Sequence, residues 1–259
     1  MKTNMIRRVL GGLAVAVLGS SLANASSITW YNNIFIPPDS PTSASSSPVG
    51  APNQYSTPYT ATVTIPTFDP STGNPGTTNQ LTSVEIVLNW VASGSVNVFN
   101  FDQSSGHSFT AAQSSVPLTI TGPDGTVVNT TAITGPSGPG FVAAAPNCGF
   151  PLCASETTVS GLTGSGTANN NVVGAGLNSY YGNGITTLSF NYTSGNATYG
   201  GTETGGSGHL AFGGTGIDGA GIQVTYNYVT VPTPEPGSFL VLGSALLGLG
   251  VLIRKRNKA

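Results

Sequence analysis

The sequence predicts an all-β protein, an antiparallel β-sandwich flanked by an N-terminal signal helix and a C-terminal transmembrane helix. Three observations lead to this prediction. The composition is rich in Gly, Thr, Ser, Asn and Val and poor in strong helix formers. Apolar residues between the ends alternate with polar ones at period two. Long apolar runs flanked by basic residues occur only at the two ends, which leaves residues 26–230 as one domain.

The strands follow from this alternation. It is clearest in Ser83–Val91, Thr187–Thr193 and Gly221–Val229, where every second side chain is apolar, as in a half-buried strand. Weaker versions occur in five shorter segments: Ile28–Ile36, Tyr59–Ile65, Ser95–Phe101, Val116–Thr121 and Thr126–Ile133. Eight strands at this spacing predict a β-sandwich, with a jelly-roll topology as one alternative.

Gly and Pro mark the expected turns. Ser93-Gly94 is expected to close one hairpin and Pro123-Asp124-Gly125 another. The run Gly214–Gly219 matches G-x-G-x-x-G, but a strand pattern follows it, so we expect a glycine-rich turn instead of a dinucleotide site. Pro37–Pro58 contains six prolines and Gly135–Ser155 contains Gly-Pro-Ser-Gly-Pro-Gly, so both are predicted loops.

The first 25 residues have the pattern of a secretory signal peptide. Basic residues precede the apolar run Val9–Gly19, and Ala23-Asn24-Ala25 supplies the small residues of a cleavage site. We expect cleavage after Ala25. The implied partners are the Sec translocase and signal peptidase.

Residues 231–259 contain three parts in a fixed order. Pro234, Glu235 and Pro236 form a stiff, extended peptide with one charge. The apolar run 239–253 follows and, at about 1.5 Å per residue, reaches roughly 22 Å, enough for a short membrane segment. Arg254, Lys255 and Arg256 then hold the C-terminus in the cytoplasm.

This tail closely resembles the PEP-CTERM sorting signal, which membrane proteases called exosortases read in bacteria that produce exopolysaccharide. The resemblance implies an exported protein that is transiently anchored in the inner membrane and then reaches the cell surface or the medium. It also implies an association with exopolysaccharide or biofilm. A plain C-terminal membrane anchor is the alternative.

Charge placement agrees with export. All seven basic residues lie within 1–8 or 254–259, and all nine acids lie between these ends. A body without Lys or Arg cannot neutralise phosphates, so nucleic acid is excluded as a partner. Weak surface binding of Ca²⁺ stays open.

A second resemblance covers roughly Ile28–Val229. It rests on TVTIPTFDPSTGN, LTSVEIVLNWVASGSVNVFNFD, LTITGPDG and the closing AGIQVTYNYV. These segments look like the choice-of-anchor E domain, an extracellular β-domain found before several sorting tails. This family has no agreed activity, so the resemblance implies fold and location and no catalytic residue.

The two cysteines, Cys148 and Cys153, are expected to form one small structural disulfide in the oxidising compartment. A metal pair or a redox dithiol are the alternatives. Against these, the only soft co-ligands, His107 and His209, lie far away in sequence, and a redox motif has two intervening residues instead of four.

No enzyme motif stands out. G-x-S-x-G is absent, Ser207 beside His209 lies in a glycine turn, and Glu85, Glu156 and Glu203 read as solvated acids. We therefore expect no catalytic residue, no cofactor and no metal, and interpret the two histidines as ordinary polar residues at strand ends.

Aromatic residues outside the clearest strands favour one binding alternative. These are Trp30-Tyr31, Tyr55, Tyr59, Tyr180-Tyr181 and Tyr199. Flat rings can stack on sugars, although the same rings can also fill the sandwich. The sequence thus predicts a non-enzymatic envelope or matrix protein, with a lectin-like carbohydrate-binding module and a secreted hydrolase as the alternatives.

Overall fold

The computed structural model of this chain describes residues 24–34, 44–47, 52–73, 75–145, 154–206, 208–233 and Leu247. Several predicted features lie outside these residues: Ala23, Cys148, Cys153, Pro234, Glu235, Pro236, Arg254, Lys255 and Arg256. Within the described part of the chain, no helix is long and apolar enough to cross a membrane. Leu247 is the only described residue of the predicted segment 239–253.

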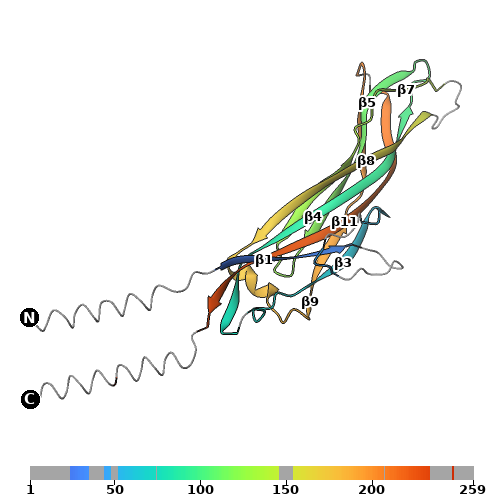
Figure 1. Cartoon of the computed structure of the whole chain (residues 1–259). Helices are drawn as coiled ribbons and strands as arrows, with labels where there is room; N and C mark the ends of the chain where they lie inside the picture. The colour runs from blue at the N-terminus through green and yellow to red at the C-terminus, as the bar shows by residue number, and fades with distance from the viewer. Residues whose placement is uncertain are drawn as a thin grey trace, which may run out of the picture.

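The described chain is nearly all β and forms two antiparallel sheets (Figure 1). The first sheet has the order β1 (Asn24–Asn33), β11 (Leu210–Pro232), β4 (Thr77–Asn100), β8 (Ser155–Val172), with β2 (Tyr55–Ser56) also on β11. The second has the order β10 (Thr198–Glu203), β5 (His107–Thr121), β9 (Thr187–Ser194), β3 (Tyr59–Pro66). Also paired with β5 are β6 (Val127–Thr134) and β7 (Gly140–Val142), and a 3-10 helix, η1, covers Gly174–Tyr180.

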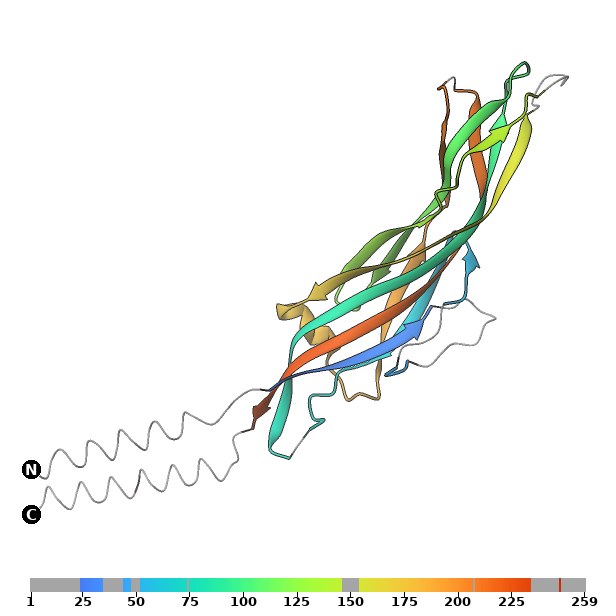
Figure 2. The same ribbon diagram turned by 45° about the horizontal axis from the view of Figure 1, so that its top comes forward.

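The main strands cross repeatedly between the two sheets. Strands β1, β4, β8 and β11 lie in one sheet, and the intervening β3, β5, β6 and β9 lie in the other. The paired orders β1-β11-β4-β8 and β3-β9-β5-β6 are those of a jelly roll, the topology that the sequence left as one alternative. Figure 2 shows the elongated sandwich from a second direction, with the start of β1 and the end of β11 at one end.

The core follows the predicted alternation. Val84, Ile86 and Leu88 of β4 are fully buried, and they belong to one cluster with residues of the opposite sheet such as Phe190. A smaller cluster around Phe109 fills the far half, toward β7. Pro123-Asp124-Gly125 does join two antiparallel strands, β5 and β6, as predicted.

The hairpin predicted at Ser93-Gly94 is wrong, because both residues lie inside the continuous strand β4. Gly94 pairs with Gly216 of β11, and a Cβ at Gly94 would collide with the carbonyl oxygen of Thr215. Here the glycine permits close approach of two backbones. Beside it, two residues of β8 including Gly161 (φ +70°) oppose Ser95, which forms a β-bulge.

The turn predicted at Gly214–Gly219 is wrong for the same reason. The whole run lies in β11 and pairs with residues of β4 from Val91 to Val96. A Cβ at Gly214 would collide with the carbonyl oxygen of Ser95, so the glycine serves strand pairing. The G-x-G-x-x-G match therefore has no phosphate-binding geometry.

The strands slightly overrun the predicted domain limits, since they extend from Asn24 to Pro232. Ala25, the expected last residue of the signal peptide, pairs with Val229 in β1. Cleavage after Ala25 would leave the remaining pairs of β1, from Ser26 to Asn33, in place.

A buried carboxylate connects the two sheets. Asp218 of β11 is fully buried, and its carboxylate accepts hydrogen bonds from the hydroxyls of Tyr59 of β3 (3.0 Å) and of Tyr192 and Ser194 of β9 (2.6 Å each). Burial raises the pKa of Tyr59 and of Tyr192 far above that of a free phenol, so both stay protonated and donate. In a body without Lys or Arg, hydroxyl donors satisfy the oxygens of this buried side chain.

We expect Asp218→Ala to lower the free energy of unfolding by about 3 kcal/mol or more. The substitution removes the acceptor of three hydroxyl groups, and two of the residues that carry them, Tyr192 and Ser194, stay buried. Urea unfolding followed by tryptophan fluorescence measures the change. Glu85→Ala, which removes an acid from a partly exposed position on β4, is the matched control and should cost about 0.5 kcal/mol or less. Equal effects of the two substitutions would refute a structural role for Asp218.

Candidate functional site

The structure places the aromatic residues singled out in the sequence in two settings. Tyr180 is fully buried and donates a hydrogen bond to Asp124 (2.7 Å), so its interpretation as an exposed stacking ring is wrong. The others are half-buried: Trp30, Tyr31, Tyr55, Tyr59, Tyr181 and Tyr199. Of these, Tyr199 lines one pocket and Trp30 lines another, which has the more apolar lining.

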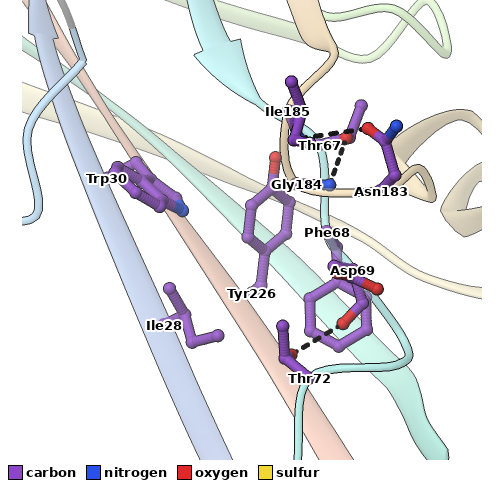
Figure 3. A pocket seen from close by; sticks show the side chains of 10 residues that line it. All are labelled: Ile28, Trp30, Thr67, Phe68, Asp69, Thr72, Asn183, Gly184, Ile185 and Tyr226. Carbon is purple, nitrogen blue, oxygen red and sulfur yellow. Dashed lines mark hydrogen bonds between the residues drawn. The ribbon is translucent and has the colours of Figure 1, made fainter.

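This pocket has a volume of about 290 Å³ and lies beside the edge strand β1 (Figure 3). Trp30 and Ile28 of β1 form one side, and Tyr226 of β11 lies between them and the loop residues. The other side comes from two loops, one after β3 and one before β9. The pocket therefore opens where both sheets end in edge strands.

The apolar part of the pocket is rigid. Phe68 and Tyr226 are buried, their ring centroids lie 5.7 Å apart, and the Tyr226 hydroxyl donates to the Pro66 carbonyl oxygen at 2.7 Å. Trp30 adds a half-buried ring from the neighbouring strand. The half-buried Trp30 ring is therefore the aromatic surface that a ligand can reach, and the two buried rings hold the pocket wall in place.

The polar part is held by local hydrogen bonds. The Asn183 side-chain oxygen accepts from the backbone N–H of Ile185 (3.0 Å) and of Thr186 (2.9 Å), which fixes the loop. The Asp69 carboxylate accepts from the hydroxyl and the N–H of Ser71, and these bonds lower its pKa below the usual range. An aromatic wall with fixed amide and carboxylate groups at its edge suits the apolar face and the hydroxyls of a sugar ring.

A second cluster of functional side chains lies at the end of the sandwich where β4 ends and β11 begins. Asn100, the last residue of β4, pairs with Leu210, the first residue of β11. This pair brings Asp102 and His209 together, and β5 begins beside them with His107. Both histidines lie at strand ends, as predicted, but they are more than ordinary polar residues, since their ring centroids lie 5.0 Å apart.

His107 lies between two carboxylates. Its Nε2 is 3.0 Å from Asp102 Oδ2, and its Nδ1 is 2.8 Å from Glu203 Oε1. Glu203 Oε2 in turn accepts from the backbone N–H of Gly208 (2.9 Å) and of His209 (3.1 Å). The side chains of Asp102, His107 and Glu203 are only 18, 13 and 9 % exposed.

Electrostatics match this geometry. Hydrogen bonds from His107, from the hydroxyl and N–H of Ser104 and from the N–H of Ser105 hold the pKa of Asp102 far below its usual value, so it is a carboxylate. Both ring nitrogens of His107 face carboxylate oxygens. This arrangement orients the imidazole ring, and it differs from that of a catalytic base, in which one ring nitrogen faces a serine hydroxyl. Ser207, two residues before His209 in the sequence, lies outside the described residues.

The acids weighed for a glycosidase pair do not share a common setting. Glu85 accepts a hydrogen bond from Asn169 of β8, Glu156 is exposed on β8, and Glu203 contacts His107. The prediction of Glu203 as a solvated acid is wrong, because it ends β10 and its side chain is nearly buried.

Comparison of the chain with protein-family models, with curated proteins and with solved structures found no match.

Proposed function

We propose that this chain is an exported, non-enzymatic protein of the cell envelope or extracellular matrix, sorted by an exosortase-type system. The observation that carries the proposal is the pairing of Asn24 with Thr230. Asn24 is the second-last residue of the predicted signal peptide, and the predicted sorting tail begins at Val231, directly after Thr230. Both targeting segments therefore join the sandwich at adjoining points.

This pairing has a mechanical consequence for export. Neighbouring strands lie about 4.8 Å apart, so a precursor held by both segments can attach to one membrane through a single end of the sandwich. The start of β5 and β7 lie at the opposite end (Figure 1). In the proposed orientation this distal end faces away from the membrane.

The charge distribution supports the same function. The body between the two basic ends carries nine acids and no Lys or Arg, so its surface depends on Ser, Thr, Asn and Gly. Such a surface suits an extracellular, polysaccharide-rich setting. The proposed partners are the Sec translocase, signal peptidase, an exosortase and exopolysaccharide, and the protein ends at the cell surface or in the medium.

A second candidate function, a lectin-like carbohydrate-binding module, is favoured by the pocket at Trp30. Its aromatic wall and its fixed Asp69 and Asn183 supply the two kinds of contact that a sugar requires. This candidate is compatible with sorting, because it describes what the exported domain would hold.

Topology can be tested with a reporter enzyme that is active only in the cytoplasm. Between Gly138 and Pro139 the chain runs in a connection between β6 and β7, and a Cβ at Gly138 would meet no atom within 4 Å. We expect a reporter inserted there to be silent, and the same reporter fused after Ala259 to be active while the precursor persists. Activity at Gly138 would refute export.

Recognition of the tail can be tested with Glu235→Ala, which retains both prolines and the membrane segment. We expect the variant to accumulate as a full-length precursor in the inner membrane, whereas the wild type loses the tail. Intact-mass measurement of both proteins decides the outcome. Thr233→Ala, just before the motif, is the control and should be processed normally. A wild type that reaches the surface still ending in Arg-Asn-Lys-Ala would show a plain membrane anchor.

The pocket can be tested with the polysaccharide of the producing cell. We expect Trp30→Ala to weaken retention on that polysaccharide by about tenfold, a loss of roughly 1.4 kcal/mol. Tyr31→Ala is the matched control, because adjacent side chains of a strand point to opposite faces, and it should bind as the wild type does. Equal retention of all three proteins would remove the pocket from consideration as a sugar site.

A further inference from the structure

The distal end of the sandwich holds a set of side chains with the chemistry of a metal site. One ligand atom from each of Asp102, His107 and His209 lies within 4.8 Å of the others. Two imidazoles and a carboxylate form a nitrogen- and oxygen-donor set that prefers first-row transition metals such as zinc, whereas Ca²⁺ prefers oxygen ligands alone.

The distances between these atoms suit one small ion. At zinc bond lengths of about 2.0–2.1 Å, two ligands of a tetrahedral ion are roughly 3.3 Å apart. Asp102 Oδ2 and His107 Nε2 are already 3.0 Å apart, and the His107 and His209 rings lie 5.0 Å apart between centroids. A metal ion would replace the proton that His107 Nε2 shares with Asp102 Oδ2, and the His209 ligand atom, within 4.8 Å of the other two, would move closer to complete the set.

Glu203 supplies the outer contact that metal-bound histidines usually have. A carboxylate on the second ring nitrogen fixes the tautomer and the orientation of a ligating imidazole. Glu203 Oε1 lies 2.8 Å from His107 Nδ1, which leaves Nε2 facing Asp102. Backbone N–H groups of Gly208 and His209 hold the other oxygen of Glu203, so one acidic side chain orders both histidine-bearing segments.

We propose that Asp102, His107 and His209 bind one divalent transition-metal ion of the zinc type, with Glu203 as the positioning residue of His107. The site is separate from the sorting tail and from the Trp30 pocket. Three protein ligands leave a fourth tetrahedral position for water or for a donor from another molecule.

The ion would connect the two sheets at an end of the sandwich that has few buried apolar residues. Asp102 follows β4 and His209 precedes β11 in the first sheet, while His107 begins β5 and Glu203 ends β10 in the second. The nearby hydrophobic cluster is small, with six buried residues. Metal bonds between the two layers would therefore stabilise this end against opening.

The test uses the full chain, purified in detergent without a polyhistidine tag and treated with a chelator. We expect isothermal titration with Zn²⁺ to show one site of micromolar affinity or better, and Zn²⁺ to raise the melting temperature. Ca²⁺ at the same concentration should do neither. Absence of a zinc site in the wild type would overturn the proposal.

Three variants locate the site. His209→Ala keeps the backbone bonds of this residue and should weaken zinc binding at least about tenfold, and Glu203→Gln should weaken it by about 10–100-fold while leaving a measurable site. The double variant Cys148→Ser, Cys153→Ser should bind as the wild type does. Unchanged binding in His209→Ala, or loss only in the cysteine variant, would refute the assignment.

Circular dichroism at room temperature separates unfolding from ligand loss. We expect a wild-type spectrum for His209→Ala in the absence of metal, together with a melting temperature that no longer responds to Zn²⁺. A folded His209→Ala protein that is still stabilised by Zn²⁺ would also refute the proposal.

Discussion

The long antiparallel ladder between β4 and β11 is the constraint on which the other features depend. It runs from the Thr77–Pro232 pair to the Asn100–Leu210 pair with one register shift, between Asn227 and Tyr228, and at about 3.3 Å per residue this is roughly 70 Å. Because β1 and β8 pair with the two outer sides of this ladder, it fixes the length of the first sheet. It also determines which residues meet at each end, Asn24 and Thr230 at one and the His107 cluster at the other.

Two glycines and one buried acid allow the two strands of this ladder to pair closely and to pack against the other sheet. Gly94 and Gly214 allow backbones to approach where a Cβ would collide with a carbonyl oxygen, and the bulge in β8 bends the sheet beside them. Asp218 then ties the middle of β11 to β3 and β9 through hydroxyl groups. The body contains no lysine or arginine, so the groups that pair with Asp218 across the two layers are hydroxyls of Tyr and Ser.

The two ends of the sandwich suit different tasks. The Asn24–Thr230 pair lies where the two proposed targeting segments would join the domain. The proposed metal site lies at the far end, where the loops after β4 and before β11 meet. The Trp30 pocket lies between edge strands and belongs to neither end. The proposed sorting, metal-binding and sugar-binding functions therefore use different parts of the molecule.

The sequence by itself determined the features that depend on local patterns. Period-two alternation located the buried face of β4 at Val84–Trp90, and Pro-Asp-Gly located a true turn, because both signals act between neighbouring residues. Strand β8 was missed since its Ser, Thr, Gly and Asn residues show no apolar alternation, and pairing with β4 makes it a strand. Ser93-Gly94 and Gly214–Gly219 resemble turns locally, and only the opposite strand makes them extended. Likewise His107 and His209 are 102 positions apart, so nothing short-range relates them, and only the Asn100–Leu210 pairing brings their rings together.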